Sequence, residues 1–109
     1  MCSAASPELL EQLENVRLEA PEKLVLNCRI SPGDPAAQSS WYRDGTSGVF
    51  SEIFTDQKYE ITAHDDTRSL IIAVSEVTDS ATYRCEAVNK YGKVRTQCRV
   101  VVLRMFHVY

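Results

Sequence analysis

The feature that most constrains this chain is a set of short segments in which apolar and polar residues alternate. A period of two is typical of β-strands that bury one face and expose the other. Turn signals separate the segments, including Asp44-Gly45 and the stretch Asn89–Gly92, where we expect Gly92 to adopt a positive φ. The alternating segments are Leu24–Ile30, Leu70–Val74, Tyr83–Ala87 and Cys98–Val102. The pattern predicts an all-β fold, either an antiparallel sandwich or a barrel.

One segment near the N-terminus does not follow this pattern. Ser6-Pro7-Glu8 resembles the start of a helix, with proline at the first helical position and an acid in the first turn. The apolar residues that follow, Leu9, Leu10, Leu13 and Val16, lie at helical spacing. Taken alone, these residues slightly favour a helix over a strand.

Two cysteines and a tryptophan add a second constraint. Trp41 follows Cys28 by 13 positions, and Cys85 follows Cys28 by 57. Tyr83 precedes the second cysteine by two positions, where a tyrosine corner would allow its hydroxyl to bond to the backbone. These residues fit a sandwich in which the two cysteines face each other across the gap between the sheets. The indole ring would pack beside them.

With these residues the chain resembles immunoglobulin domains of the intermediate set (I-set), most closely those of giant intracellular muscle proteins such as titin, twitchin and obscurin. The resemblance covers residues 7–103 and includes Cys85–Gly92, which is similar to the family's strand F and its turn into strand G. It implies an immunoglobulin-like β-sandwich of two antiparallel sheets. Residues 1–6 would be a tail or linker, and residues 104–109 a C-terminal extension. Pro7–Leu18 would form the A and A′ strands rather than a helix.

The stretch from Thr46 to Gln57 is longer than the family usually has between strands C and D. It carries four large apolar residues, Val49, Phe50, Ile53 and Phe54. Two outcomes are open. Either these side chains fold back over the sheet edge as a local flap, or they stay partly exposed as a docking patch for a partner.

The cysteines leave a further choice open. Cys28 and Cys85 form either a disulfide or a pair of reduced thiols in the core, depending on the redox compartment. Cys98 points inward by strand alternation and is expected to be a structural thiol. The closely spaced ligands of a metal site are missing, because His64 and His107 are far apart and no Cys-x-x-Cys occurs. Asp65-Asp66 fits a solvated turn better than an acid–base pair.

Composition narrows the range of functions. Hydrophobic residues make up 44% and charged residues 25%, as in an ordinary globular domain. The net charge is −3 and no Lys/Arg run occurs, so we expect no nucleic-acid binding. The longest uncharged apolar run has five residues, so we expect no membrane insertion. No Asn-x-Ser/Thr acceptor occurs and at least two of the four cysteines are unpaired by position, which together favour a cytoplasmic location.

We therefore expect a non-catalytic immunoglobulin module, without a cofactor or a metal, in a large intracellular muscle or cytoskeletal protein. It would act as a spacer, as a force-bearing element through Val16–Leu18 paired with Val94–Val100, and as a docking unit. Its partners would be neighbouring domains and cytoskeletal proteins. The alternating residues Arg104–Tyr109 would allow weak self-association through an extended strand. The alternative is an extracellular adhesion or receptor domain that carries a Cys28–Cys85 bond.

Overall fold

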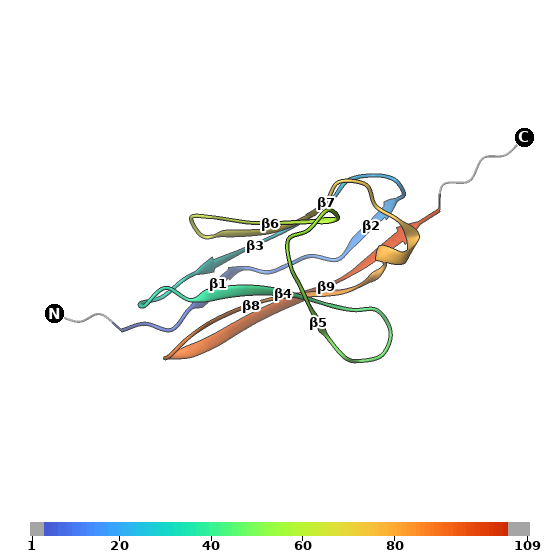
Figure 1. Ribbon diagram of the computed structural model, residues 1–109. Coiled ribbons are helices and arrows are strands. Elements are labelled where there is room, and N and C mark those ends of the chain that lie inside the picture. The colour runs from blue at the N-terminus through green and yellow to red at the C-terminus, as the bar shows by residue number, and fades with distance from the viewer. Residues whose placement is uncertain (1–3, 105–109) are drawn as a thin grey trace, which may run out of the picture.

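The computed structural model describes residues 4–104. Within this range lie nine strands and one short 3-10 helix, η1, which form the two packed layers seen in Figure 1. The elements in chain order are β1 (Glu8–Glu11), β2 (Val16–Glu19), β3 (Leu24–Ser31), β4 (Gln38–Asp44), β5 (Ser51–Ile53), β6 (Tyr59–His64), β7 (Thr67–Ile72), η1 (Val77–Asp79), β8 (Ala81–Asn89) and β9 (Gly92–Leu103). The prediction of an all-β immunoglobulin-like sandwich is confirmed.

The strands form a sheet of four and a sheet of five. The first has the order β1-β3-β7-β6 and the second has the order β2-β9-β8-β4-β5. Neighbouring strands are antiparallel except β2 and β9, which run parallel. The described chain begins at one end of the sandwich and ends at the other (Figure 1). A pull on the two ends therefore acts along the strands.

Strict alternation places the core between the two sheets. In β3 and β8 every second side chain is buried and the intervening ones face outward. The buried set from these two strands is Leu24, Leu26, Cys28, Ile30, Ala81, Tyr83, Cys85 and Ala87. Each square ångström of apolar surface that leaves water contributes about 25 cal/mol. This burial fixes the register, because a shift of one residue would turn the whole set toward solvent.

The segment that resembles a helix locally is divided between β1 and β2, one strand for each sheet. Leu9 lies opposite the buried Ile30, while Leu10 faces outward. Leu13 is buried at the crossing between the sheets, and its N–H donates to Thr96 Oγ1 at 3.0 Å. Pairing with β3 and β9 stabilises the extended form, whereas an isolated helix of this length is marginal in water.

The turn glycines differ from the sequence expectation. Asp44-Gly45 does not close a tight hairpin, because a wider loop leads to β5 and stands out from the sandwich (Figure 1). Gly48 takes the positive φ of that loop, 81°, and its N–H donates to Asp44 Oδ1 at 3.1 Å. Gly92 does not have a positive φ. The Asn89 side chain organises that turn, since its Oδ1 accepts the N–H of Gly92 at 3.1 Å.

The folded domain begins earlier than the expected boundary after residue 6. Ala5 pairs with Asp34 through two backbone hydrogen bonds of 3.0 and 2.9 Å. The Asn89 side-chain amide also donates to the Ala5 carbonyl at 2.7 Å. Gly33 allows this approach, because a Cβ at that position would lie 2.4 Å from the Ala5 oxygen. Ala5 therefore contacts the sandwich from beyond the expected boundary.

Candidate protein-docking face

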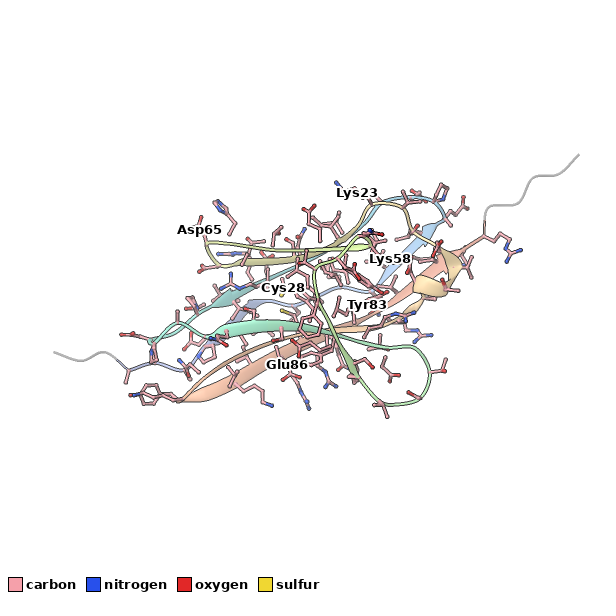
Figure 2. The ribbon with its side chains drawn as sticks, viewed as in Figure 1. Lys23, Cys28, Lys58, Asp65, Tyr83 and Glu86 are labelled. Atoms are coloured by element: carbon pink, nitrogen blue, oxygen red, sulfur yellow. The ribbon has the colours of Figure 1, made fainter. Side chains whose placement is uncertain are left out.

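The cysteine pair lies at the centre of the sandwich. Cys28 and Cys85 are completely buried, and Figure 2 shows Cys28 between the two layers. The hydrogen bond with Cys28, together with burial, raises the pKa of the Cys85 thiol far above its ordinary value. Burial raises the pKa of the third core thiol, Cys98, to about 11. The hydrogen bond with Cys85 lowers the pKa of the Cys28 thiol. Thiols that stay protonated at neutral pH are poor nucleophiles, so Cys85 and Cys98 fill space between the sheets.

Two aromatic residues complete the core. Trp41 is buried and lies opposite Cys85 in the pairing of β4 with β8. The Tyr83 hydroxyl donates to the Asp79 backbone carbonyl at 2.7 Å, which ties the start of β8 to η1. Burial raises the pKa of Tyr83 to about 12. A neutral phenol is needed here, because only its protonated form donates to the carbonyl.

The two adjacent acids, Asp65 and Asp66, lie together in the hairpin turn between β6 and β7. Asp65 has a φ of 53°. Figure 2 shows Asp65 at the tip of that hairpin. Asp66 Oδ2 lies 3.7 Å from a guanidinium nitrogen of Arg29. Over residues 4–104 there is no group of three or more His, Cys, Asp or Glu side chains that could hold a metal ion.

The long stretch between β4 and β6 carries the four apolar residues that the sequence grouped together, and their environments differ. It contains β5, which pairs with β4 along the edge of the five-stranded sheet. Ile53 lies opposite Trp41 and is only 7% exposed, so it belongs to the core and not to an exposed patch. Val49 and Phe54 are 68% and 66% exposed. Neither a packed flap nor a continuous apolar patch describes this region.

Phe50 has an environment different from that of the buried Ile53 and from that of the exposed Val49 and Phe54. It is half-buried, and the guanidinium carbon of Arg84 lies 3.8 Å from the centre of its ring. Arg84 is held by Gln97, whose Oε1 accepts from Nε at 3.1 Å and from Nη2 at 3.0 Å. Its Nη1 lies 3.7 Å from Glu86 Oε2, and Figure 2 shows Glu86 on the outer side of this sheet. Strands β5, β8 and β9 thus share one surface centred on Arg84.

Sequence reasoning missed Arg84 and the basic residues of β9. Lys93, Arg95 and Arg99 alternate with inward-facing residues, so they never form a run in the sequence. In the strand they lie on the same outer face, and all three are exposed. The signal that was available is the uneven distribution of charge along the chain.

The other edge of the five-stranded sheet is formed by β2. Its four residues, Val16–Glu19, pair in parallel with Val100–Leu103. Only Val100 of the expected partner segment Val94–Val100 takes part. The chain crosses between the sheets beside the earlier part of β9, where side chains replace the ladder. There the N–H of Arg99 donates to Asn15 Oδ1 at 2.8 Å.

Comparison with known proteins identifies the family. The Immunoglobulin I-set domain family matches residues 7–102. The chain belongs to this family. It is 34% identical over 100 residues to the muscle M-line assembly protein unc-89 of Caenorhabditis elegans, covering 91% of this chain and 1% of that protein. It is 34% identical over 97 residues to smooth muscle myosin light chain kinase of Gallus gallus, covering 89% of this chain and 5% of the kinase.

Solved I-set structures agree with this assignment. The titin domains Z1Z2 in complex with telethonin superpose with a TM-score of 0.87 at 25% identity, covering 97% of this chain and 51% of that one. The family and these relatives indicate a non-catalytic module. The chain spans only a few per cent of the length of the curated relatives given above.

Two expectations concern membranes and the C-terminal end. No helix among the described residues has the length and apolar character needed to cross a membrane. Of the expected strand extension at residues 104–109, Arg104 follows the end of β9 at Leu103 without being part of the strand, and residues 105–109 lie outside the described residues.

Proposed function

We propose that this chain is one immunoglobulin module of a large cytoplasmic muscle or cytoskeletal protein, where it acts as a spacer, bears force and docks partners. The muscle and cytoskeletal relatives support this assignment. Its I-set unit covers residues 7–103, extended at the N-terminal side by Ala5. Its partners are neighbouring domains and proteins of the same cytoskeletal assembly.

The observation that carries the mechanical role is the parallel pairing of β2 with β9. The first of these strands comes early in the sequence but lies beside the last residues of the second, which leads out at the C-terminal end (Figure 1). When the chain ends are pulled apart, the two strands slide along each other in opposite directions. The hydrogen bonds between them are loaded in parallel and must break nearly together.

The phase of these hydrogen bonds can be read from one of them. The N–H of Ala20 donates to the Leu103 carbonyl at 2.8 Å. Because N–H groups alternate along a strand, the N–H of Leu18 also faces β9, and the N–H of Arg17 faces away. Because proline lacks the N–H, a proline at position 18 removes a bond to β9 together with the Leu18 packing on the core, whereas a proline at position 17 removes neither.

Single-molecule unfolding by a pull on the two chain ends tests this role. Leu18→Pro should clearly lower the unfolding force, because it removes a donor to β9. Arg17→Pro should leave most of the force intact, since proline is tolerated on the open side of an edge strand. Equal forces for the wild type and Leu18→Pro, with both proteins folded, would contradict the mechanical role.

A cytoplasmic location has a consequence for the redox state of the cysteines. We propose that Cys28 and Cys85 are thiols in the native compartment, since cytosolic proteins are kept reduced. The core is filled without the bond, so the fold should survive reductant. Oxidation would add about 2–4 kcal/mol by restricting the unfolded chain.

Intact-mass measurement before and after alkylation under denaturing conditions distinguishes the cytoplasmic proposal from the extracellular alternative. Full alkylation of the protein from its native source is expected. A mass that shows two cysteines protected would favour the extracellular alternative. Unfolding by reductant alone would contradict the view that packing suffices.

A further inference from the structure

Charge is distributed very unequally over this chain. Residues 81–104 carry six of the twelve basic side chains but only one of the fifteen acidic ones, Glu86. The remaining residues hold the other six basic and fourteen acidic side chains. The protein has a net charge of −3, yet the β8–β9 region is strongly basic. A local field opposite in sign to the whole molecule favours binding of an acidic partner at that region.

The fold gathers this charge on the outer face of the five-stranded sheet. Arg95 and Arg99 are exposed there, and across residues 4–104 no carboxylate lies within ion-pair distance of either. The single acid, Glu86, is already engaged, with Arg84 at 3.7 Å and with Lys93 at 3.5 Å. Arg99 Nη1 donates one long hydrogen bond, 3.4 Å, to Thr82 Oγ1, so both guanidinium groups remain available for carboxylates of another molecule.

Apolar residues lie at and around β5, the edge strand of the same sheet. Phe50 stacks on Arg84, and Phe54 and Val49 are largely exposed beyond it. Aromatic residues and arginine are the types enriched at the centres of protein interfaces. We define the basic–aromatic face by Val49, Phe50, Phe54, Arg84, Arg95 and Arg99.

We propose that the basic–aromatic face docks an acidic protein segment that also carries an apolar side chain. This inference rests on the docking role proposed above. Carboxylates of the segment would pair with Arg95 and Arg99, and the apolar side chain would lie against Phe54. Besides Glu86, the sheet carries the exposed Glu52 of β5, opposite Tyr42. These two carboxylates favour a protein over a nucleic acid, because they would repel an unbroken phosphate chain.

Sheet geometry sets the spacing that such a segment needs. The order β9-β8-β4-β5 places three strand intervals between Arg95 and Arg99 on β9 and the β5 edge, which Phe54 follows. At about 4.8 Å per interval, the two parts lie roughly 14 Å apart. An extended chain rises about 3.3 Å per residue, so its acids and its apolar side chain should be about four residues apart.

A peptide titration followed by amide NMR tests the proposal on the full chain. The probe is a synthetic peptide with one tryptophan placed four residues before three glutamates. We expect saturable shifts confined to β8, β9 and the residues around β5, which weaken as salt is added. Arg95→Glu with Arg99→Glu should weaken binding about tenfold. Lys23→Glu, a charge reversal at an exposed position beside the other sheet, should not change it.

Variants of the probe and of the face separate the two contributions. Moving the tryptophan next to the glutamates should weaken binding severalfold. Phe54→Ser should weaken binding of the original peptide and leave a tryptophan-free peptide unaffected. Because both arginines and Phe54 are exposed, these variants should keep the wild-type spectrum elsewhere.

Four results would overturn the proposal. The first is no shift at millimolar peptide, and the second is shifts scattered over both sheets. The third is equal binding of an oligothymidylate of the same charge, which would indicate a surface for any polyanion. The fourth is that the same amides shift on concentrating the protein alone, which would indicate a second copy as the occupant. None of these results would affect the mechanical test, so failure of the docking inference and failure of the force-bearing role can be distinguished.

Discussion

The two outer strands of the five-stranded sheet, β2 and β5, differ in pairing direction and in side-chain chemistry, since β2 is parallel to its neighbour and β5 antiparallel. Both are short, and each pairs with a longer strand on one side only. β2 directs Val16 and Leu18 toward the core and lies next to the exit of the chain. β5 directs only Ile53 inward and is flanked by exposed apolar residues. We infer that the first edge resists force and the second contributes to recognition.

The largest expected effect is on the free energy of unfolding, and it differs between the buried and the exposed residues of the β5 edge. Ile53→Ala should lower the free energy of unfolding by about 2–5 kcal/mol, because it opens a cavity beside Trp41. Phe54→Ala should change it by no more than about 0.5 kcal/mol, because that ring lies mostly in solvent. Urea denaturation of both variants measures the difference. Equal losses would mean that the edge packs as a single flap.

The second effect is a loss of stability at high pH, caused by ionisation of Tyr83, whose hydroxyl bonds to the Asp79 carbonyl. Tyr83 keeps its proton in the native state up to a pKa of about 12, against 10.0 for the ordinary side chain. The unfolded chain therefore loses the proton first, and stability falls as the pH rises from 10 to 12. The expected loss is about 2 kcal/mol.

Tyr83→Phe is the control for this titration. It should be less stable at pH 8 by about 1–3 kcal/mol, because it lacks the bond to the Asp79 carbonyl. Its stability should fall less between pH 10 and 12 than that of the wild type. The core thiols titrate in both proteins, so their contribution cancels in the comparison. Parallel curves would show that Tyr83 does not ionise on unfolding.

A smaller effect is expected where a side chain continues the β2 pairing. Asn15→Ala removes the acceptor of the Arg99 N–H and should cost about 1 kcal/mol. Glu14→Ala, an exposed neighbour, should cost almost nothing. Thermal unfolding of the two variants at equal concentration makes the comparison. If the two variants melt together, the Asn15 bond does not contribute.

The smallest effect lies on the β5 side, in the contact between Phe50 and Arg84. A double-mutant cycle with Phe50→Leu and Arg84→Gln should give a coupling of about 0.5–1 kcal/mol, as for an exposed cation–π pair. A coupling near zero would mean that the stacked geometry is not held in solution.

The sequence predicted the centre of the fold well and its edges poorly, for physical reasons. Cys28, Tyr83 and Cys85 lie on strands whose alternation is local, so a short window suffices to recognise which way they face, whereas Trp41 was recognised by its spacing from Cys28. The pairing of β2 depends on how many residues the chain needs to cross between the sheets. No local pattern encodes that number, and the expected partner segment was therefore displaced toward the start of β9.

The docking face was hidden for a related reason. Ile53 and Phe54 are adjacent in the sequence and similar in hydrophobicity, and only pairing with β4 decides that the first is buried. Arg95 and Arg99 are separated by inward-facing residues, so the basic row exists only in the folded strand. Surfaces built across strands require the register, which the sequence alone does not supply.

The direction of pulling tests the division between the two edges most directly. The same domain is unfolded through its two chain ends and, separately, through a handle inserted at Ser47 together with the C-terminal end. In the first geometry β2 and β9 shear, while in the second β9 opens one hydrogen bond after another from Leu103. A mechanical role for β2 predicts a much higher unfolding force between the chain ends. Equal forces in the two directions would contradict it, because resistance would then follow overall stability rather than the β2–β9 pair.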